Sequence, residues 1–213
     1  MAINYTVQAE VVDITADTPK AEDAFLVDTN VWYWMTYSKA SHSARPPAYY
    51  QKSNYPNYTN AALGAGASIF QSGLSLAELT HLIEKAEYEI FAQANPVLFP
   101  NPNKFDKDFR HARDIERKQV VSEIETAWAQ VKSLASPLTV TIDVSATSNA
   151  LGRLYTEKVD GYDLYILESM KTNGIVQIIT DDGDFATVPN IQVFTANRNV
   201  IRAARSQGYF VSR

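Results

Sequence analysis

The stretch AFLVDTNVWYW, residues 24–34, passes directly from an apolar run to an acid and then to a row of large aromatic side chains. The run Ala24 to Val27 predicts a buried strand, and Val31 to Tyr37 predicts a short helix held by aromatic anchors. Asn30 already suits the N-cap of that helix, which leaves Asp28 without a structural role. The stretch therefore predicts a buried strand that ends in a functional carboxylate.

The composition is that of an ordinary globular protein. The chain has 213 residues, of which 46% are hydrophobic and 20% charged, so we expect one domain with a core of normal size. It has no cysteine, which excludes disulfides, thiol catalysis and zinc-thiolate sites. A net charge of -5 argues against wholesale wrapping of nucleic acid, but it is compatible with a nuclease whose negative charge is concentrated at a metal site.

The opening stretch, MAINYTVQAEVVDITADTPK, has neither a basic start nor an apolar block, so no signal peptide is expected. No apolar run approaches the length of a membrane span. We expect a soluble, cytoplasmic protein that does not associate with membranes.

Short apolar strands alternate with helices, and this order predicts an α/β protein with a parallel sheet covered by helices on both faces. Residues 1–23 are predicted to be an N-terminal arm or an added strand, and residues 24–213 the main domain. Residues 38–58, with several tyrosines and prolines and no periodicity, are predicted to be an insertion or long loop. Strands are expected at 68–71, 138–144, 175–180 and 191–194, and helices at 59–66, 74–93, 105–134, 146–157, 160–173 and 200–207.

Acids from four separate stretches are predicted at a strand end or a helix start. In open parallel sheets the reactive site lies outside the carboxyl ends of the strands, so these acids are expected at one edge. They are Asp28 after the first strand, Asp181, Asp182 and Asp184 after the strand at 175–180, and Glu78 and Asp163 in the first turns of their helices.

Each acid also has a purely structural interpretation. Ser75 and Glu78 match a capping box, Asp163 favours the dipole of a helix that Asp160 can cap, and residues 181–184 suit a polar turn. Taken together, however, several ionised carboxylates at one sheet edge repel one another, and burial strengthens the repulsion. A divalent cation such as Mg²⁺ or Mn²⁺, which prefers hard oxygen ligands, removes that repulsion.

Four motifs in order and spacing resemble the PIN-domain nucleases: VDTNVW at 27–32, SLAEL at 75–79, YDLYILESM at 162–170 and TDDGDF at 180–185. The resemblance implies an α/β/α sandwich and a metal-dependent endoribonuclease. By position it implies that the four catalytic acids are Asp28, Glu78, Asp163 and Asp182, with Asp184 as the alternative fourth acid and Asn30 and Thr180 as supporting residues.

The resemblance also implies a mechanism and partners. Asp28, Asp163 and Asp182 would bind one or two Mg²⁺ or Mn²⁺ ions, while Glu78 would hold a metal-bound water or act as a base. The compact toxin members of the family are neutralised by an antitoxin, so an antitoxin is a candidate partner beside RNA. Apart from the resemblance, the tyrosines between 49 and 58 could anchor a second copy in a homodimer. This chain is longer than those members, and its N-terminal arm and 38–66 region depart from the minimal pattern.

Positive charge for RNA is expected on the final helix, where Arg198, Arg202 and Arg205 share one face. The alternative is a solvated helix whose cations favour its dipole. The tyrosines between 49 and 58 could stack on unpaired bases or pack within the protein, and packing is preferred. The three histidines fit none of the motifs; they are His42, His81 and His111.

Three other functions are alternatives to a nuclease. A haloacid-dehalogenase-like phosphatase would carry Asp-x-Asp, but Asn30 stands at the second position. A receiver-type signalling domain would want a lysine after a later strand, which TDDGDF does not supply. A catalytically silent PIN-like scaffold that binds RNA or protein gives no reason to keep mutually repelling acids.

Overall fold

The computed structural model describes residues 5–99, 101 and 105–213. In these residues seven strands form one sheet in the order β4-β3-β2-β5-β6-β1-β7, and every pairing is parallel. The predicted α/β class with a parallel sheet is confirmed. The strands are β1 (Glu10–Asp13), β2 (Ala24–Val27), β3 (Ser68–Ser72), β4 (Ser136–Leu138), β5 (Gln177–Ile179), β6 (Gln192–Thr195) and β7 (Phe210–Val211).

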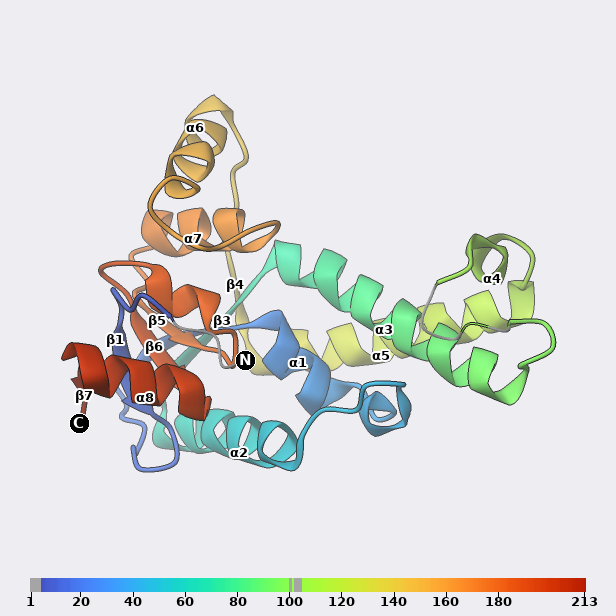
Figure 1. Ribbon diagram of the computed structural model, residues 1–213, viewed down its shortest axis with the longest axis horizontal. Helices are drawn as coiled ribbons and strands as arrows, with labels where there is room; N and C mark the ends of the chain where they lie inside the picture. Colours follow the sequence, from blue (N-terminus) through green and yellow to red (C-terminus); the bar gives the residue numbers. More distant parts are fainter. Residues whose placement is uncertain (1–4, 100, 102–104) are drawn as a thin grey trace.

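Helices cover both faces of the sheet (Figure 1). They are α1 (Thr29–Thr36), α2 (Tyr49–Ala65), α3 (Gly73–Ala94), α4 (Lys107–His111), α5 (Asp114–Leu134), α6 (Val144–Arg153), α7 (Asp163–Thr172) and α8 (Arg198–Gln207), with short 3-10 turns at Ala40–His42 and Asp184–Thr187. Because these helices lie on both faces of the sheet, the protein has the α/β/α arrangement of layers.

Successive side chains along each strand point to opposite faces of the sheet, so the core consists of two layers. Phe25, Val27 and Ile179 pack against α1, α2, α3 and α5 on one face. Leu26 and Ile178 pack against α7 and α8 on the other face. The central strand β2 is thus buried on both sides, which places its carboxyl end, and Asp28, at the middle of one sheet edge.

The segment predicted as an N-terminal arm contains a strand of the sheet. β1 lies between β6 and β7, with Val11 opposite Val193 and Phe210. Of the two structures expected for residues 1–23, the structure shows the added strand, and residues 1–4 lie outside the described residues.

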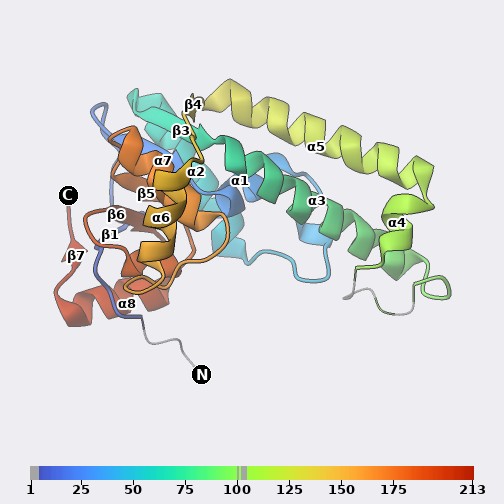
Figure 2. The ribbon, with the colours of Figure 1, turned by 90° about the horizontal axis from the view of Figure 1, so that it is seen from above.

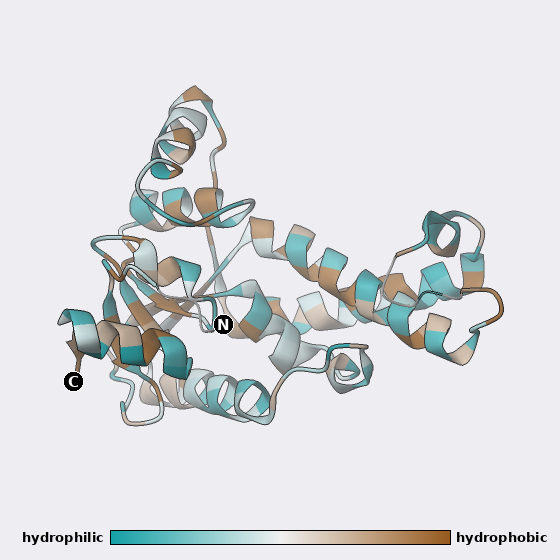
Figure 3. Cartoon of the chain, viewed as in Figure 1, coloured by the Kyte–Doolittle hydropathy of each residue, from teal (hydrophilic) through white to brown (hydrophobic). Residues whose placement is uncertain are grey.

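The prediction of a loop at 38–58 is wrong from residue 49 onward, because α2 begins there and continues to Ala65. The face that α2 buries is formed mainly by Tyr55, Tyr58 and Thr59, which do not stand out as an apolar stripe. Figure 3 shows α2 mostly teal and white for the same reason, whereas α8 carries hydrophilic and hydrophobic residues along its length.

Two further predicted elements differ from the structure. The single helix expected at 105–134 is two helices, α4 and α5, and residues 102–104 lie outside the described part. The strand expected at 138–144 ends at Leu138, and Asp143 caps α6 by accepting a hydrogen bond from the Ala146 backbone N–H at 2.8 Å.

Helices α3 and α5 run side by side away from the sheet and carry α4 at their far end (Figures 1 and 2). A separate aromatic cluster of Tyr88, Phe91, Phe99, Phe105 and Phe109 fills the end of this projection. Buried Glu84 is paired there with Arg110 and Arg117. Among the helices of the described residues, none is long and apolar enough to cross a membrane.

Candidate active site

Asp28 lies at the end of β2 and is the N-cap of α1. Its Oδ1 accepts a 2.6 Å hydrogen bond from the Thr29 backbone N–H, and its Oδ2 accepts one of 2.7 Å from the Thr180 hydroxyl. The assignment of the N-cap to Asn30 is therefore wrong, and Asp28 does have a structural role. That role does not exclude a catalytic one, because each carboxylate oxygen accepts more than one bond.

Glu78 lies further along α3 than the sequence predicted. Ser72 caps this helix by accepting a hydrogen bond from Leu74 N–H at 3.2 Å, and Ser75 is already inside it. Glu78 is thus in the second turn, where it cannot complete a capping box, so the capping interpretation is wrong. Its Oε2 is buried without a hydrogen-bond partner among the described residues.

Asp163 is the first residue of α7, close to its predicted place. The N-cap position is taken by Tyr162, whose side chain makes no capping hydrogen bond, while the Asp160 carbonyl accepts from the Asp163 N–H at 3.0 Å. The Asp160 side chain does not cap this helix.

The four acids Asp28, Glu78, Asp163 and Asp182 are brought together electrostatically. Burial, with the Glu78 and Asp182 carboxylates, raises the pKa of Asp28 to about 7. Burial, with Asp28, Asp182 and Glu78, raises the pKa of Asp163 to about 9. Burial and Asp182 also raise the pKa of Glu78. Each of the six pairs among the four acids thus contributes to these pKa shifts, and we call the four acids the acid cluster.

The acidic turn after β5 is tied to Asp28 through Thr180. The Thr180 hydroxyl accepts a 2.9 Å hydrogen bond from Asp182 N–H, and Asp182 Oδ1 accepts one of the same length from Asp184 N–H. Burial raises the pKa of Asp182, as it does that of Asp184. Asp182 is therefore held toward the cluster, and Asp184 lies at its margin.

The donor set fits a divalent cation in charge and chemistry. Four carboxylates with raised pKa values gain from a cation, and Glu78 Oε2 is a buried acceptor that makes no hydrogen bond, although the Thr29 side chain partly offsets the rise in the pKa of Glu78. In the described part of the chain, no three histidine, aspartate or glutamate side chains have the arrangement that holds a metal ion. The acids therefore influence one another's pKa values without forming a complete three-ligand metal site among the described residues.

Asp181, which the sequence placed among the acids at the sheet edge but not in the catalytic set, links α2 to the acidic turn. Its Oδ1 accepts a 2.5 Å hydrogen bond from the Tyr55 hydroxyl, and its Oδ2 accepts bonds from Tyr50 at 3.0 Å and Gln51 at 2.6 Å. The Asn197 side chain donates to the Asp181 carbonyl at 2.9 Å. The tyrosine-rich stretch was the only signal for this contact.

Two further neighbours of the acids were also missed. Asp160 is exposed, and its charge helps to raise the pKa values of Glu78, Asp163 and Asp182. The Tyr5 ring lies against Gly183, where a Cβ would come within 2.2 Å of Tyr5 Cζ. Neither contact is visible as a motif.

The arginines of α8 are exposed and extend from the acidic edge along the helix. Arg198 follows Asn197 at the end joined to Asp181, whereas Arg205 lies over the Phe210 ring at 4.3 Å. Only the first turn of this helix is therefore next to the acids. The three histidines are exposed, and the charge of His81 acts on Glu78.

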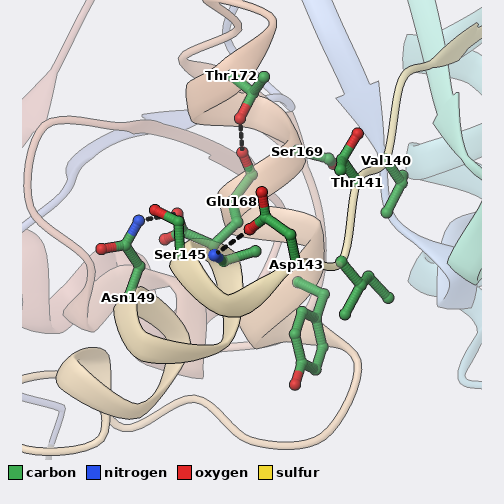
Figure 4. Close-up of a pocket in the computed structure, with 11 residues that line it drawn as sticks. Val140, Thr141, Asp143, Ser145, Asn149, Glu168, Ser169 and Thr172 are labelled. Atoms are coloured by element: carbon green, nitrogen blue, oxygen red, sulfur yellow. Dashed lines mark hydrogen bonds between the residues drawn. The ribbon is translucent and has the colours of Figure 1, made fainter.

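A cavity of about 330 Å³ lies between α6 and α7, apart from the acids (Figure 4). Its carboxylates are already engaged. Asp143 caps α6, and Glu168 accepts hydrogen bonds from Asn149 at 3.2 Å and Arg153 at 2.7 Å. With its acids paired in this way, the cavity offers no free acid for catalysis.

A parallel α/β/α sheet with acids from β2, α3, α7 and the turn after β5 at one edge defines a nuclease-type fold. The family model of the PIN domain matches residues 25–191, so the chain belongs to the PIN-domain family. The resemblance read from the four motifs is confirmed. No curated protein matches this sequence.

Proposed function

We propose that this protein is a metal-dependent endoribonuclease that hydrolyses phosphodiester bonds of RNA. The supporting observation is the mutual interaction of all pairs among Asp28, Glu78, Asp163 and Asp182. A scaffold without catalysis has no need for four acids that repel one another, of which Asp28 is buried and the other three are half-buried, whereas a cation site does.

In this proposal Asp28, Asp163 and Asp182 hold Mg²⁺ or Mn²⁺, with Asp184 beside them. When bound, the ion lowers the pKa of a water ligand and polarises the phosphoryl oxygens. Thr180 fixes the Asp28 carboxylate through its 2.7 Å hydrogen bond, so that carboxylate needs little reorientation.

Glu78 is the proposed general base. Its Oε2 would accept the proton of the attacking water while the water oxygen bonds to phosphorus. The leaving oxygen would depart with the electron pair of the broken P–O bond and take a proton from solvent water. Its raised pKa makes it a stronger base than an exposed glutamate. Loss of such a group typically costs about 10²–10⁴ in rate.

The test is incubation with labelled single-stranded RNA, with Mn²⁺, with Mg²⁺ and with EDTA. We expect cleavage by the wild type in either metal and none in EDTA. Asp28→Asn and Glu78→Gln should lose cleavage, and Glu125→Gln, an exposed acid on α5, should keep it. Cleavage in EDTA, or cleavage that survives Asp28→Asn unchanged, overturns the proposal.

A second candidate is a PIN-like scaffold that binds RNA without cutting it. Its support is the spacing of the acids, which leaves no three-acid metal arrangement in the described residues. The two candidates differ in one result, since a scaffold retards RNA in a gel with Mn²⁺ present yet leaves it intact. A role as a toxin with an antitoxin or as a homodimer is a further proposal, tested by co-purification and by mass in solution.

A further inference from the structure

A second hollow, the α1–α3 cavity, lies beside the acid cluster. It has a volume of about 260 Å³ and is lined by residues from α1, α2, α3 and the 43–47 segment, among them Asn30, Tyr33, Trp34, Arg45, Gln51 and Lys85. This is slightly below the roughly 300 Å³ typical of small-ligand sites. It has room for one planar group and not for a duplex.

Three helices that line the α1–α3 cavity also carry or contact the acids of the sheet edge. Asn30 follows Asp28 by two residues, and Leu82 and Lys85 lie one and two helical turns beyond Glu78. Gln51, a lining residue, donates a 2.6 Å hydrogen bond to Asp181 in the acidic turn. A strand that crosses the acids therefore reaches this cavity within a nucleotide or two.

The lining combines an aromatic surface with cations. Tyr33 is buried, and Trp34 is half-buried with its ring 5.4 Å from that of Tyr55. Arg45 and Lys85 are exposed, and neither forms an ion pair within the described part of the chain. Aromatic faces stack on unpaired bases, and arginine and lysine bind phosphate.

The one acid in the lining, Glu89, is already engaged. It is 5% exposed and its Oε2 accepts a 2.9 Å hydrogen bond from Ala44 N–H. This bond holds the 43–47 segment, and with it Arg45, over the α1–α3 cavity. The Glu89 carboxylate thus already has a hydrogen-bond partner in the protein, while Arg45 and Lys85 face solvent.

We infer that the α1–α3 cavity binds one unpaired nucleotide of the RNA strand, with its base against Trp34 and its phosphate between Arg45 and Lys85. The inference rests on the proposed function for the identity of the strand. It makes the substrate single-stranded, because a base must leave its stack to enter. It also adds a phosphate-binding site apart from the arginines of α8.

The test is binding, measured by fluorescence anisotropy of a labelled single-stranded RNA in EDTA, where no metal-dependent cleavage occurs. Trp34→Ala should raise Kd at least about five-fold, and Trp34→Phe should preserve binding. Arg45→Ala and Lys85→Ala should each weaken binding and flatten its salt dependence by about one phosphate contact. The matched controls, Tyr155→Ala and Lys118→Ala, change exposed residues elsewhere and should leave Kd unchanged.

Three results would overturn the inference: unchanged Kd in Arg45→Ala and Lys85→Ala, equal affinity for duplex RNA, or full competition by inorganic polyphosphate. Trp34 packs near Tyr55, so Trp34→Ala could fail to fold. In that case Arg45→Ala and Lys85→Ala still decide the test. Cleavage is scored separately. If the wild type binds RNA through this cavity but does not cleave it, the proposed nuclease activity is wrong and the proposed nucleotide site stands. If the wild type cleaves RNA and the variants bind it with unchanged Kd, the nucleotide site is wrong and the nuclease activity stands.

Discussion

The Thr180 hydroxyl joins Asp28 to Asp182, since it donates to Asp28 Oδ2 at 2.7 Å and accepts from the Asp182 backbone N–H at 2.9 Å. Thr180 is fully buried, so water cannot replace either bond. One side chain at the end of β5 thereby sets both the orientation of the first acid and the conformation of the acidic turn.

Replacing this hydroxyl by a methyl group in Thr180→Val is expected to lower both stability and cleavage. The buried Asp182 N–H and Asp28 carboxylate would each lose a partner, at a cost of about 1–3 kcal/mol. Urea unfolding measures the loss, and initial cleavage rates measure the effect on the site. Thr180→Ser keeps the hydroxyl and should retain most of both; a serine variant as impaired as the valine variant would contradict this account.

The raised pKa values of Asp28 and Asp163 predict that the metal-free protein loses stability as pH rises. Their folded-state pKa values of about 7 and about 9 lie above the ordinary aspartate value of 3.8, so the folded state binds more protons than the unfolded state in this range. Stability from these groups is full below pH 3.8 and is lost as pH rises through the folded-state pKa values.

Thermal unfolding in EDTA from pH 5 to pH 8 measures this loss. Asp28→Asn should have a flatter pH dependence than the wild type, because one repelling charge is gone. Mn²⁺ should raise the Tm of the wild type most at high pH, where the acids are charged, and should do little for Asp28→Asn. An identical slope in the two proteins would contradict the electrostatic cluster.

The acidic turn accommodates the Tyr5 ring only because residue 183 is glycine. A Cβ there would lie 2.2 Å from Tyr5 Cζ, while the φ of -74° at Gly183 suits any residue. Gly183→Ala should therefore displace the end of the Tyr5 side chain rather than distort the turn. In a double-mutant cycle of unfolding free energies, Gly183→Ala should cost more in the wild type than in Tyr5→Ala. Equal costs in the two backgrounds would refute the contact.

The sequence predicts well those strands whose own apolar pattern already determines their secondary structure, without contacts from distant parts of the fold. β2 and β6 were placed within one residue because residues buried on both faces form continuous apolar runs. The position of Asp28 follows from the same pattern, because the strand must end before a charged side chain.

The positions that sequence reasoning missed depend on choices between near-equivalent residues. Ser72 and Ser75 are both good N-caps, and the structure uses the first, which moves Glu78 from a cap into the cluster. Helix α2 buries Tyr55, Tyr58 and Thr59, whose side chains all carry a hydroxyl group, and it contains Pro56. The hydroxyl groups of Tyr55 and Tyr58 form hydrogen bonds with residues that are distant in the sequence, so no local sequence pattern reveals these contacts.

Tyr55 is predicted to be the strongest link between α2 and the acidic turn. Its hydroxyl donates to Asp181 Oδ1 at 2.5 Å and accepts from Ala196 N–H at 2.9 Å, with the whole side chain buried. Tyr55→Phe leaves the Ala196 N–H without its partner and removes one of three donors to the Asp181 carboxylate, so it should cost about 1–3 kcal/mol of unfolding free energy. Tyr50→Phe, which removes one half-buried bond of 3.0 Å to the same carboxylate, should cost less. A larger loss in Tyr50→Phe would contradict this ranking.

At the other end of α2, Arg213 is predicted to stabilise the fold and to have no part in RNA binding. Its guanidinium pairs with Asp17 at 2.6 Å and Asp23 at 2.5 Å, whose side chains are 2% and 3% exposed. Burial opposes the charge of Asp23, but the hydrogen bond from Arg213 holds its pKa below the ordinary value.

Arg213→Met should therefore destabilise the protein by about 3–5 kcal/mol, the usual cost of leaving a buried charge without its partner. Because the pKa of Asp23 is lowered in the folded state, its contribution is full above the unfolded-state pKa and disappears as pH falls through the folded-state value. The stability difference between wild type and variant should thus shrink in acid, as followed by urea unfolding at pH 3 and pH 7. RNA binding measured below the melting temperature should be unchanged, and a variant with normal stability but weakened RNA binding would place Arg213 at the substrate instead.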